Sequence, residues 1–261
     1  MRIDAGTRAL VTGASRGIGL ATARALAARG ATVAMVARGE EELAQRAQEI
    51  GGEAHPADVS DRGSIAAAVE GFASKAGGID LLVANAGIVR YAPFADQPIE
   101  DAEEMVRINV LGTIYTVKAA LAPMLDQGRG HIVVISSGAG LRSFPWGAVY
   151  GATKAADRGF AEALRHELSG TGVSVTTVYP GEVATEIHSG RRDRLPDWRS
   201  NDEEIPPEPL AQEIVAAVES DRRAVYMPGA VRVLGLSGIA PRLVDRLLAA
   251  VRGGSAAPRR D

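Results

Sequence analysis

A tyrosine and a lysine four positions apart are the residues of this chain best suited to acid/base chemistry. Tyr150 and Lys154 open a run with helical spacing, so both side chains would project from one helix face. A phenol normally has a pKa near ~10, and a neighbouring ammonium lowers that pKa by favouring the phenolate. We therefore predict that Tyr150 exchanges a proton with a substrate oxygen, although a pair with this spacing also occurs by chance.

A serine thirteen positions before this tyrosine is a candidate for the same site. Ser137 follows the apolar run 131–136, which is typical of a buried strand. Open α/β proteins bind ligands at the carboxyl ends of their strands, so the Ser137 hydroxyl would reach the cleft and hold the substrate oxygen. Ser136 is a rival for this role, and the alternative for Ser137 is a turn residue.

A glycine-rich turn near the start of the chain has the properties of a phosphate-binding loop. The first apolar run leads into Thr12-Gly13-Ala14-Ser15-Arg16-Gly17-Ile18-Gly19 and then into a helical pattern. Glycines let the backbone approach a pyrophosphate, and the N–H groups at the helix start attract the anion. The spacing departs from the common G-x-G-x-x-G pattern, so the alternative is a tight connection without a ligand. Its position between a strand and a helix favours a dinucleotide site.

The end of the second predicted strand indicates which dinucleotide is bound. An acid about 20 residues after the glycines would bind the ribose 2′-OH of NAD, whereas an arginine accommodates the 2′-phosphate of NADP. Here the strand ends in Ala37-Arg38, and Arg16 lies in the glycine turn. Glu40 and Glu41 are expected to begin the next helix, where acids favour the dipole. We predict NADP(H) in preference to NAD(H); the alternative is two solvated surface arginines.

Short β-rich runs alternate with helical patterns along nearly the whole chain. The predicted strands span residues 8–11, 32–36, 53–57, 81–84, 131–136, 174–178 and 224–227. The predicted helices span residues 18–29, 40–50, 64–76, 100–127, 149–169 and 210–220. Most strands are continuous apolar runs, as in a parallel sheet covered on both faces. We predict the α/β class: a single-domain Rossmann-type doubly wound parallel sheet flanked by helices, with the catalytic domain over residues 1–252.

Composition excludes several classes of protein. The 261 residues carry a net charge of −3, which does not suggest a nucleic-acid binder, and 46% of them are hydrophobic. The chain has no cysteine, which excludes disulfides and fits a cytoplasmic location. Its four histidines lack metal-ligand spacing, so we predict no metal site. Neither a signal peptide nor an uninterrupted apolar run long enough to span a bilayer is expected.

Two segments interrupt the alternation of strands and helices. Residues 181–209 are polar and proline-bearing, and we predict that they cover the substrate; a solvated loop is the alternative. Residues 230–252 form an apolar, arginine-bearing extension, and residues 253–261 have the composition of a disordered tail. We expect the extension to pack on the domain or on a second subunit, in preference to peripheral contact with a membrane.

Taken together, the motifs resemble the short-chain dehydrogenase/reductase family in its compact subgroup. The resemblance covers nearly all of residues 7–227. It rests on Thr12-Gly13-x-x-x-Gly17-x-Gly19, Asp58, Asn85-Ala86-Gly87, Asn109, Ser137, Tyr150-x-x-x-Lys154 and Pro180-Gly181-x-Val183-x-Thr185. Each motif is short, but their order and spacing together are highly specific.

The resemblance implies a role for each of four catalytic residues. Tyr150 would be the general acid/base, and Ser137 would orient and polarise the reacting oxygen. Lys154 would bind the nicotinamide ribose and lower the pKa of the tyrosine. Asn109 would hold a water that links Lys154 to solvent; the alternative is a helix residue that is hydrogen-bonded locally.

The resemblance also implies a set of cofactor contacts. Asp58 would contact the adenine, Asn85 to Gly87 would support the pocket unless they form only a turn, and the Val183 backbone would bond the carboxamide. The complete predicted set is Gly13, Ser15, Arg16, Gly17, Ile18, Gly19, Arg38, Asp58, Val59, Asn85, Ala86, Gly87, Tyr150, Lys154, Pro180, Gly181, Val183 and Thr185.

Apolar residues fall in the segments that line the substrate cleft of the family, which suggests a lipophilic ketone, aldehyde or secondary alcohol. The predicted substrate residues are Ser137, Leu141, Phe144, Trp146, Tyr150 and Ile187, with Tyr91, Phe94 and Val149 in the same segments. Arg142 would meet an acidic substrate, or else is solvated.

Two other functions are compatible with parts of this pattern. A nucleotide-sugar epimerase or dehydratase shares the Tyr-x-x-x-Lys pair, and a non-catalytic dinucleotide sensor shares the glycine turn. The short C-terminal part argues against the first, and the intact Ser137, Tyr150 and Lys154 argue against the second.

We expect a homodimer or homotetramer. The extension in place of the usual C-terminal tail puts the tetramer in doubt, and a dimer would use the helices 100–127 and 149–169.

Overall fold

Seven parallel strands form a single sheet, which confirms the predicted fold class. The computed structural model describes residues 1–184 and 204–238. The strands are β1 (Arg8–Thr12), β2 (Thr32–Ala37), β3 (Glu53–Pro56), β4 (Leu81–Ala84), β5 (Gly130–Ile135), β6 (Val173–Pro180) and β7 (Ala224–Met227). Their order is β3-β2-β1-β4-β5-β6-β7, and every neighbouring pair is parallel. The order reverses between β1 and β4, where doubly wound sheets bind their ligands.

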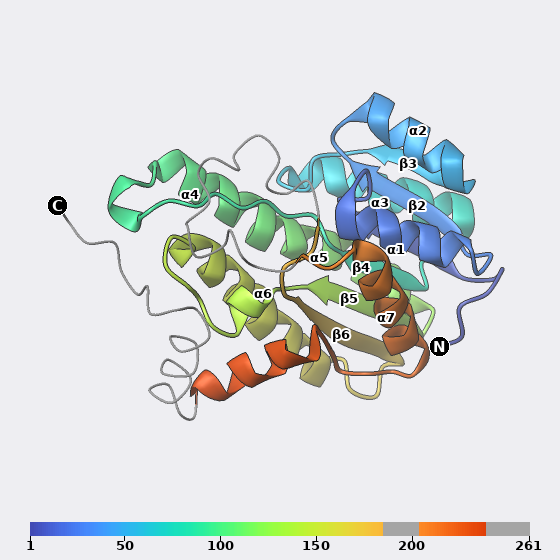
Figure 1. Ribbon diagram of the computed structural model, residues 1–261. Coiled ribbons are helices and arrows are strands. Elements are labelled where there is room, and N and C mark those ends of the chain that lie inside the picture. The colour runs from blue at the N-terminus through green and yellow to red at the C-terminus, as the bar shows by residue number, and fades with distance from the viewer. Residues whose placement is uncertain (185–203, 239–261) are drawn as a thin grey trace.

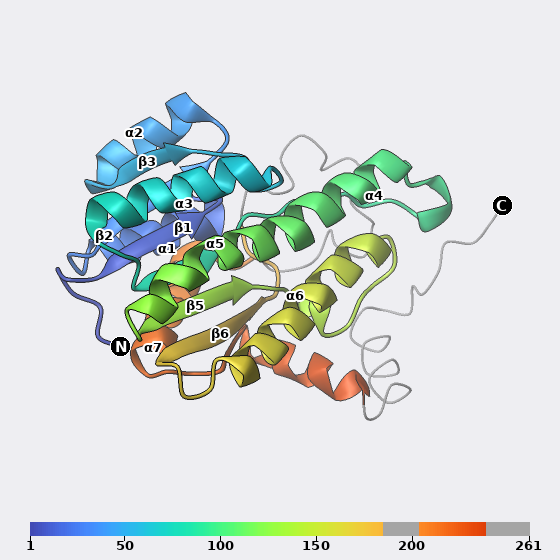
Figure 2. The ribbon, with the colours of Figure 1, turned by 180° about the vertical axis from the view of Figure 1, so that it is seen from behind.

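Helices cover both faces of the sheet (Figures 1 and 2). One layer contains α1 (Gly17–Ala27), α2 (Glu40–Ile50) and α7 (Pro207–Glu219), which are in front in Figure 1. The other contains α3 (Arg62–Ala76), α5 (Gly112–Asp126) and α6 (Ala148–Glu167), which are in front in Figure 2. Short 3-10 turns form η1 (Phe94–Asp96) and η3 (Gly138–Gly140), and the longer η7 (Gly229–Gly238) follows β7.

Each layer buries its own apolar cluster against the sheet. On the α3 side, Phe72 is fully buried and packs with side chains of α5, α6 and the strands. On the α1 side, Leu26 and Ile214 occupy the corresponding position between α1, α7 and the strands. Strands that are covered on both faces have no solvent side, which explains why the sequence reads as continuous apolar runs rather than as alternation.

The long helix predicted over residues 100–127 is continuous but not uniform. It consists of α4 (Ile99–Met105), a π-helical segment η2 (Val106–Leu111) and α5. A π-helix widens the turn, and here that turn carries the fully buried Asn109. Among the described residues, Ile99–Asp126 is the one helix long and apolar enough to cross a membrane, and 44% of its apolar window is buried within the domain.

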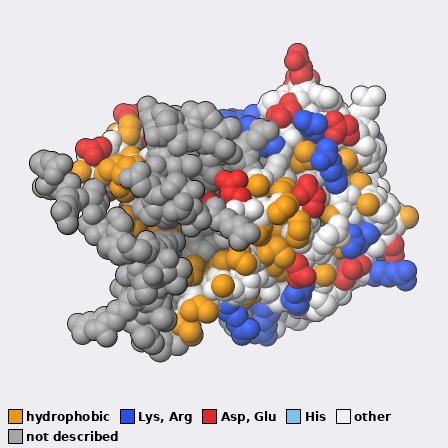
Figure 3. All heavy atoms as spheres, viewed as in Figure 1, with side chains coloured by type: hydrophobic (Ala, Val, Ile, Leu, Met, Phe, Trp, Pro, Cys, Tyr) orange, Lys and Arg blue, Asp and Glu red, His pale blue; other side chains and the backbone are white. Residues whose placement is uncertain are grey.

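The C-terminal part follows β7 as far as the structure describes it. The predicted extension begins as η7, which contacts β7 and η3 and buries Val231. Residues 239–261, which include the rest of the extension and the tail, lie outside the described residues, as do residues 185–203 of the predicted substrate-covering segment. On the face shown in Figure 3, basic and acidic side chains are interspersed rather than gathered into one basic area.

A histidine inside the sheet makes the stability of the fold depend on pH. His131 on β5 is 2% exposed, and its Nε2 lies 2.8 Å from Thr176 Oγ1 on β6. The Thr176 hydroxyl donates to the carbonyl of Arg222, so Nε2 of His131 must carry a hydrogen and donate it to Thr176. Burial lowers the pKa of His131 to about 4.

We expect the native state to lose about 3 kcal/mol through His131 as the pH falls from 6.5 to 4, because the unfolded histidine takes up a proton that the folded one resists. Above pH 6.5 this contribution is constant. Urea unfolding at several pH values checks this, and His131→Gln should show a smaller loss over the same interval. The matched control, His166→Gln at an exposed position on α6, should keep the wild-type slope. Equal slopes for His131→Gln and wild type would contradict the assignment.

Candidate active site

Two adjoining cavities open at the carboxyl ends of the strands, where the strand order reverses. The larger, about 420 Å³, runs along the glycine turn and the ends of β2 and β3. The smaller, about 90 Å³, lies beside the ends of β4, β5 and β6. Both are bordered by Ile18, Asn85 and Gly87, so one elongated ligand can occupy the two together.

The glycine turn leaves room only for backbone. Gly13 has a φ of +63°, a conformation that favours glycine. A Cβ on Gly19 would lie 2.2 Å from the carbonyl oxygen of Gly13, so no other residue fits there without moving the turn. The turn leads directly into α1, with Arg16 as its N-cap, and the first turn of α1 contains no acidic residue. The helix start therefore presents N–H groups to an anion without a competing carboxylate.

Hydrogen bonds tie this turn to the loop after β4. The Thr12 hydroxyl accepts hydrogen bonds from the backbone N–H groups of Asn85 at 3.0 Å and Ala86 at 3.1 Å. In return, Asn85 Nδ2 donates to the carbonyl of Thr12 at 2.9 Å. Asn85 therefore does more than end a strand, because its amide joins the two strands that flank the cleft.

The larger cavity brings together most of the residues predicted to bind the dinucleotide. Its lining includes Gly13, Ser15, Arg16, Gly17, Ile18, Arg38, Asp58, Val59, Asn85, Ala86 and Gly87. Arg16 and Arg38 border the same cavity and are both exposed. Asp58 Oδ1 accepts hydrogen bonds from the N–H and the hydroxyl of Ser60, both at 2.8 Å, which orients its carboxylate in the loop after β3.

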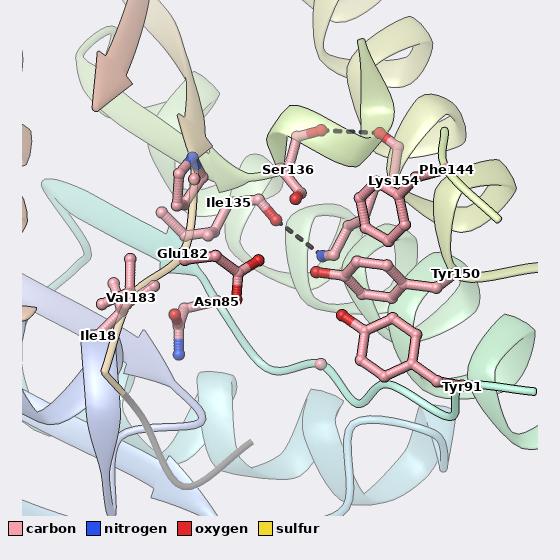
Figure 4. A pocket seen from close by; sticks show the side chains of 14 residues that line it. Ile18, Asn85, Tyr91, Ile135, Ser136, Phe144, Tyr150, Lys154, Glu182 and Val183 are labelled. Atoms are coloured by element: carbon pink, nitrogen blue, oxygen red, sulfur yellow. Dashed lines mark hydrogen bonds between the residues drawn. The ribbon is translucent and has the colours of Figure 1, made fainter. Parts of the chain in front are cut away.

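Lys154 lies buried between α6 and β5. Its Nζ donates to the carbonyl of Ile135 at 2.8 Å and to Asp157 Oδ2 at 2.9 Å (Figure 4 shows the bond to Ile135). Burial of the amine favours its neutral form, but the charge of Asp157, the interaction with Tyr150 and the hydrogen bond to Asp157 together outweigh burial and raise the pKa of Lys154. Lys154 is therefore an ammonium held in place from two sides.

Tyr150 points into the smaller cavity, with its hydroxyl beside the Lys154 amine (Figure 4). Burial raises the pKa of Tyr150, while the Lys154 charge and a hydrogen bond with Ser137 act in the opposite direction. The prediction of a net lowered tyrosine pKa is therefore wrong for the protein without ligands. The ammonium does favour the phenolate, but the exclusion of water from the hydroxyl has the larger effect.

The structure distinguishes the two serines. Ser137 lines the cavity and hydrogen-bonds with Tyr150, and its hydroxyl also accepts from the N–H of Ala139 as the cap of η3. Ser136 is 2% exposed, and its hydroxyl donates to the carbonyl of Lys154 at 2.7 Å. Both serines line the smaller cavity, but Ser137 is directed at the Tyr150 hydroxyl, whereas Ser136 fastens the end of β5 to α6.

Asn109 makes long-range contacts, contrary to the alternative of local bonding. Its side-chain Oδ1 accepts from the N–H of Ile88 at 2.8 Å, and Nδ2 donates to the carbonyl of Ile88 at 2.9 Å. Nδ2 also lies 3.0 Å from the hydroxyl of Thr153, next to Lys154 in the chain. Asn109 therefore holds the loop after β4 against α6, and the bound water implied by the resemblance stays a prediction.

One wall of the smaller cavity is partly aromatic. Tyr91 lies 6.3 Å from Phe144 and 6.3 Å from Tyr150, measured between ring centroids, and all three line the smaller cavity. Of the other predicted substrate residues, Leu141, Trp146 and Val149 are not part of its lining, and Phe94 is 70% exposed on η1. Trp146 instead joins two loops, because its carbonyl accepts from the N–H of Ala92.

The segment after β6 closes the remaining side. Pro180, Gly181, Glu182 and Val183 all line the smaller cavity, and Figure 4 shows Glu182 directed toward it. Ile205 forms a parallel bridge with this segment through the carbonyl of Glu182 and the N–H of Ala184. The bridge leaves the backbone groups of Val183 itself unused. Thr185 and Ile187 lie outside the described residues.

Two acidic residues near Tyr150 and Lys154 were not predicted. Glu182 occupies the variable position of Pro180-Gly181-x-Val183, which the motif alone does not specify. Asp157 follows Lys154 by three positions, and that helical spacing is the signal that could have found it.

Comparison with known proteins agrees with this geometry. A family model described as short chain dehydrogenase matches residues 7–196. An uncharacterized oxidoreductase of Listeria monocytogenes is 40% identical over 185 residues, which are 68% of this chain and 75% of the relative. One from Staphylococcus epidermidis is 37% identical over 184 residues, or 70% of this chain and 80% of that protein.

Solved structures share the fold over most of the chain. A short-chain type dehydrogenase/reductase from Mycobacterium marinum has a TM-score of 0.80 and 31% identity, covering 88% of this chain and 96% of that one. A short chain dehydrogenase from Burkholderia cenocepacia in complex with NADP has a TM-score of 0.79 and 30% identity, covering 89% and 100%. A short chain dehydrogenase/reductase from Burkholderia phymatum in complex with NAD has a TM-score of 0.83 and 25% identity, and the match covers 94% of this chain and 96% of that one.

We expect Gly19→Ala to weaken dinucleotide binding by at least about 10-fold, because the new methyl group would meet the Gly13 carbonyl and displace the turn. Fluorescence titration with NADPH measures the affinity. Gly71→Ala is the matched control, since a Cβ there meets nothing within 4 Å on α3. Affinity that is unchanged in Gly19→Ala would show that the turn does not bind the phosphates.

Proposed function

Because the chain belongs to the short-chain dehydrogenase/reductase family, we propose that it is an NADP(H)-dependent oxidoreductase. It would transfer a hydride between the nicotinamide and the carbon of a carbonyl or secondary alcohol. The observation that carries the proposal is the position of the Tyr150 hydroxyl, next to the Lys154 ammonium and hydrogen-bonded with Ser137 at the wall of a cavity that continues into the dinucleotide cleft.

The cleft fits a dinucleotide with a 2′-phosphate. The helix start of α1 and the glycine turn suit the pyrophosphate. Arg38 follows β2 where an NAD-binding protein would carry an acid, and Arg16 borders the same cavity, so two guanidinium groups line the cavity that would receive the phosphate. At the other end, the Val183 N–H and carbonyl would hold the carboxamide, since its bridge to Ile205 uses only neighbouring groups.

The proposed chemistry is a coupled transfer of a hydride and a proton. The bound nicotinamide supplies the hydride in reduction and accepts it in oxidation. In reduction, Tyr150 donates its phenolic proton to the carbonyl oxygen as that oxygen gains negative charge, and Ser137 holds the same oxygen by a hydrogen bond. Lys154 stabilises the phenolate that remains, and in oxidation each transfer runs in reverse.

We propose a lipophilic substrate of modest size. Tyr91, Phe144 and the ring of Tyr150 provide apolar surface on one side of the cavity. Glu182 borders the same cavity and would repel a substrate that carries an anion close to its reacting carbon.

The proposed assembly is a homodimer or homotetramer that buries the long helices. Ile99, Val106 and Leu111 expose 63%, 43% and 36% of their surface along α4 and η2, which supports an apolar contact there. The complete set of Ser137, Tyr150 and Lys154 in one cavity favours catalysis over a sensor that only binds the dinucleotide.

We expect Tyr150→Phe to lower kcat at least about 1,000-fold and to leave NADPH binding within about two-fold, because it removes the transferred proton but keeps the ring. Absorbance at 340 nm with a panel of carbonyls and alcohols measures turnover. Tyr115→Phe on α5 makes the same chemical change outside both cavities and should keep full activity. Normal turnover by Tyr150→Phe would overturn the assignment.

We expect Arg38→Asp to weaken NADPH binding at least about 10-fold more than NADH binding, because an aspartate would repel the 2′-phosphate. The dissociation constants of both dinucleotides check this. Arg223→Asp carries the same change of charge at the amino end of β7, at the opposite edge of the sheet, and should weaken neither. Equal losses for the two dinucleotides in Arg38→Asp would exclude the 2′-phosphate contact.

A further inference from the structure

A buried carboxylate, that of Asp157, forms an ion pair with Lys154. Asp157 lies on α6, one turn after Lys154, and its side chain is 2% exposed while that of Lys154 is 6% exposed. The two form an ion pair of 2.9 Å inside the domain. Asp157 does not line the cavity, so it cannot touch the substrate directly.

The pairing constrains the direction of the ammonium. An ammonium has three N–H bonds. Two of those of Lys154 point to Asp157 and to the carbonyl of Ile135. The tetrahedral geometry of the nitrogen then determines the direction of the third, and the Tyr150 hydroxyl is beside it (Figure 4). A lysine with a flexible four-carbon stem would not keep this orientation without such partners.

The pairing also preserves the charge of the ammonium. A buried lysine without a counter-ion tends to lose its proton, because the interior disfavours the charged form. Removal of one member of a buried ion pair leaves the other uncompensated. Burial raises the pKa of Asp157, while the charge of Lys154, the hydrogen bond with it and a contact with Thr113 on α5 act in the opposite direction.

Other charged groups act on the same site. Tyr150 and Asp157 are the titratable groups that act most on Lys154, and both favour its charged form. Glu182, from the segment after β6, acts on Tyr150, and it disfavours the phenolate as Asp157 does. Removal of the Asp157 charge therefore changes two titrations at once: that of the lysine and that of the tyrosine.

We infer that Asp157 is a positioning residue of the enzyme, which keeps Lys154 protonated and directs its ammonium at the Tyr150 hydroxyl. This inference rests on the proposed function for its kinetic consequences. Its structural part, the pairing of Asp157 with Lys154, is independent of any substrate.

The chain offers a direct test because it contains three lysines, Lys75, Lys118 and Lys154. With lysine labelled by ¹³C and ¹⁵N, NMR follows the titration of each side chain in the full-length protein, and Lys154→Arg identifies the signal of Lys154. In wild type, Lys154 should titrate above 10.5, its ordinary value. In Asp157→Asn its pKa should fall by at least about one unit, with Lys75 and Lys118 unchanged.

A matched control separates this effect from the loss of any buried ion pair. Asp80 is also buried and pairs with Arg8 at 2.6 Å, but it lies just before the central strand β4, at the end of the strands opposite the cavities. Asp80→Asn should lower the free energy of unfolding without moving the titration of Lys154. An unchanged Lys154 titration in Asp157→Asn, or a wild-type Lys154 that titrates at or below its ordinary value, would overturn the inference. The second outcome needs no variant to fold.

Kinetics test the consequence for catalysis. For alcohol oxidation, kcat/KM should increase with pH, and this increase should occur at a lower pH in Asp157→Asn than in wild type. The reason is that the variant lacks the Asp157 charge, which disfavours the phenolate. A falling limb should then develop where Lys154 loses its proton. A uniform loss at every pH would show a merely structural role and contradict the inference. If wild type turned over no carbonyl or alcohol, the proposed function would fail, while the lysine titration would still decide the pairing.

Discussion

The whole site depends on the reversal of strand order between β1 and β4. From β1 the chain continues through α1 on one face of the sheet, and from β4 it continues through α4, η2 and α5 on the other. The loops that follow these two neighbouring strands must diverge, and their divergence opens the cleft. The hydrogen bonds between Thr12 and Asn85, 73 positions apart in the chain, set how far the loops separate. The two cavities therefore share one boundary.

Burial sets the central electrostatic problem of the site. A cavity that excludes water strengthens the interactions between charges inside it, but it also disfavours each charge. Tyr150 shows this opposition, since burial raises its pKa while Lys154 and Ser137 act against that rise. The protein supports the charge of the Lys154 ammonium through Asp157 and the carbonyl of Ile135, which both contact it.

Two residues near the site hold the reactive groups in position by hydrogen bonds to α6. Ser136 fastens β5 to α6 through the carbonyl of Lys154, and Asn109 fastens the loop after β4 to the same helix through Thr153. Helix α6 carries both Tyr150 and Lys154, so these bonds restrict the two reactive groups together. Such a network keeps a proton donor close to one position, which efficient proton transfer requires.

Local patterns in the sequence determined the elements and the type of site. The strands were predictable to within two residues because an apolar run between turn residues is a local signal, and the glycine turn was predictable because its conformation excludes other residues. Tertiary structure alone decided which hydroxyl faces Tyr150, since Ser136 and Ser137 are neighbours and only the course of β5 into η3 separates their directions. It also removed Leu141 and Trp146 from the pocket and reversed the expected shift of the Tyr150 pKa. The lining of the pocket and the shift of the Tyr150 pKa both depend on what surrounds a side chain in space. Atoms from distant parts of the chain bury that side chain together, so the spacing of residues in the sequence cannot predict its burial.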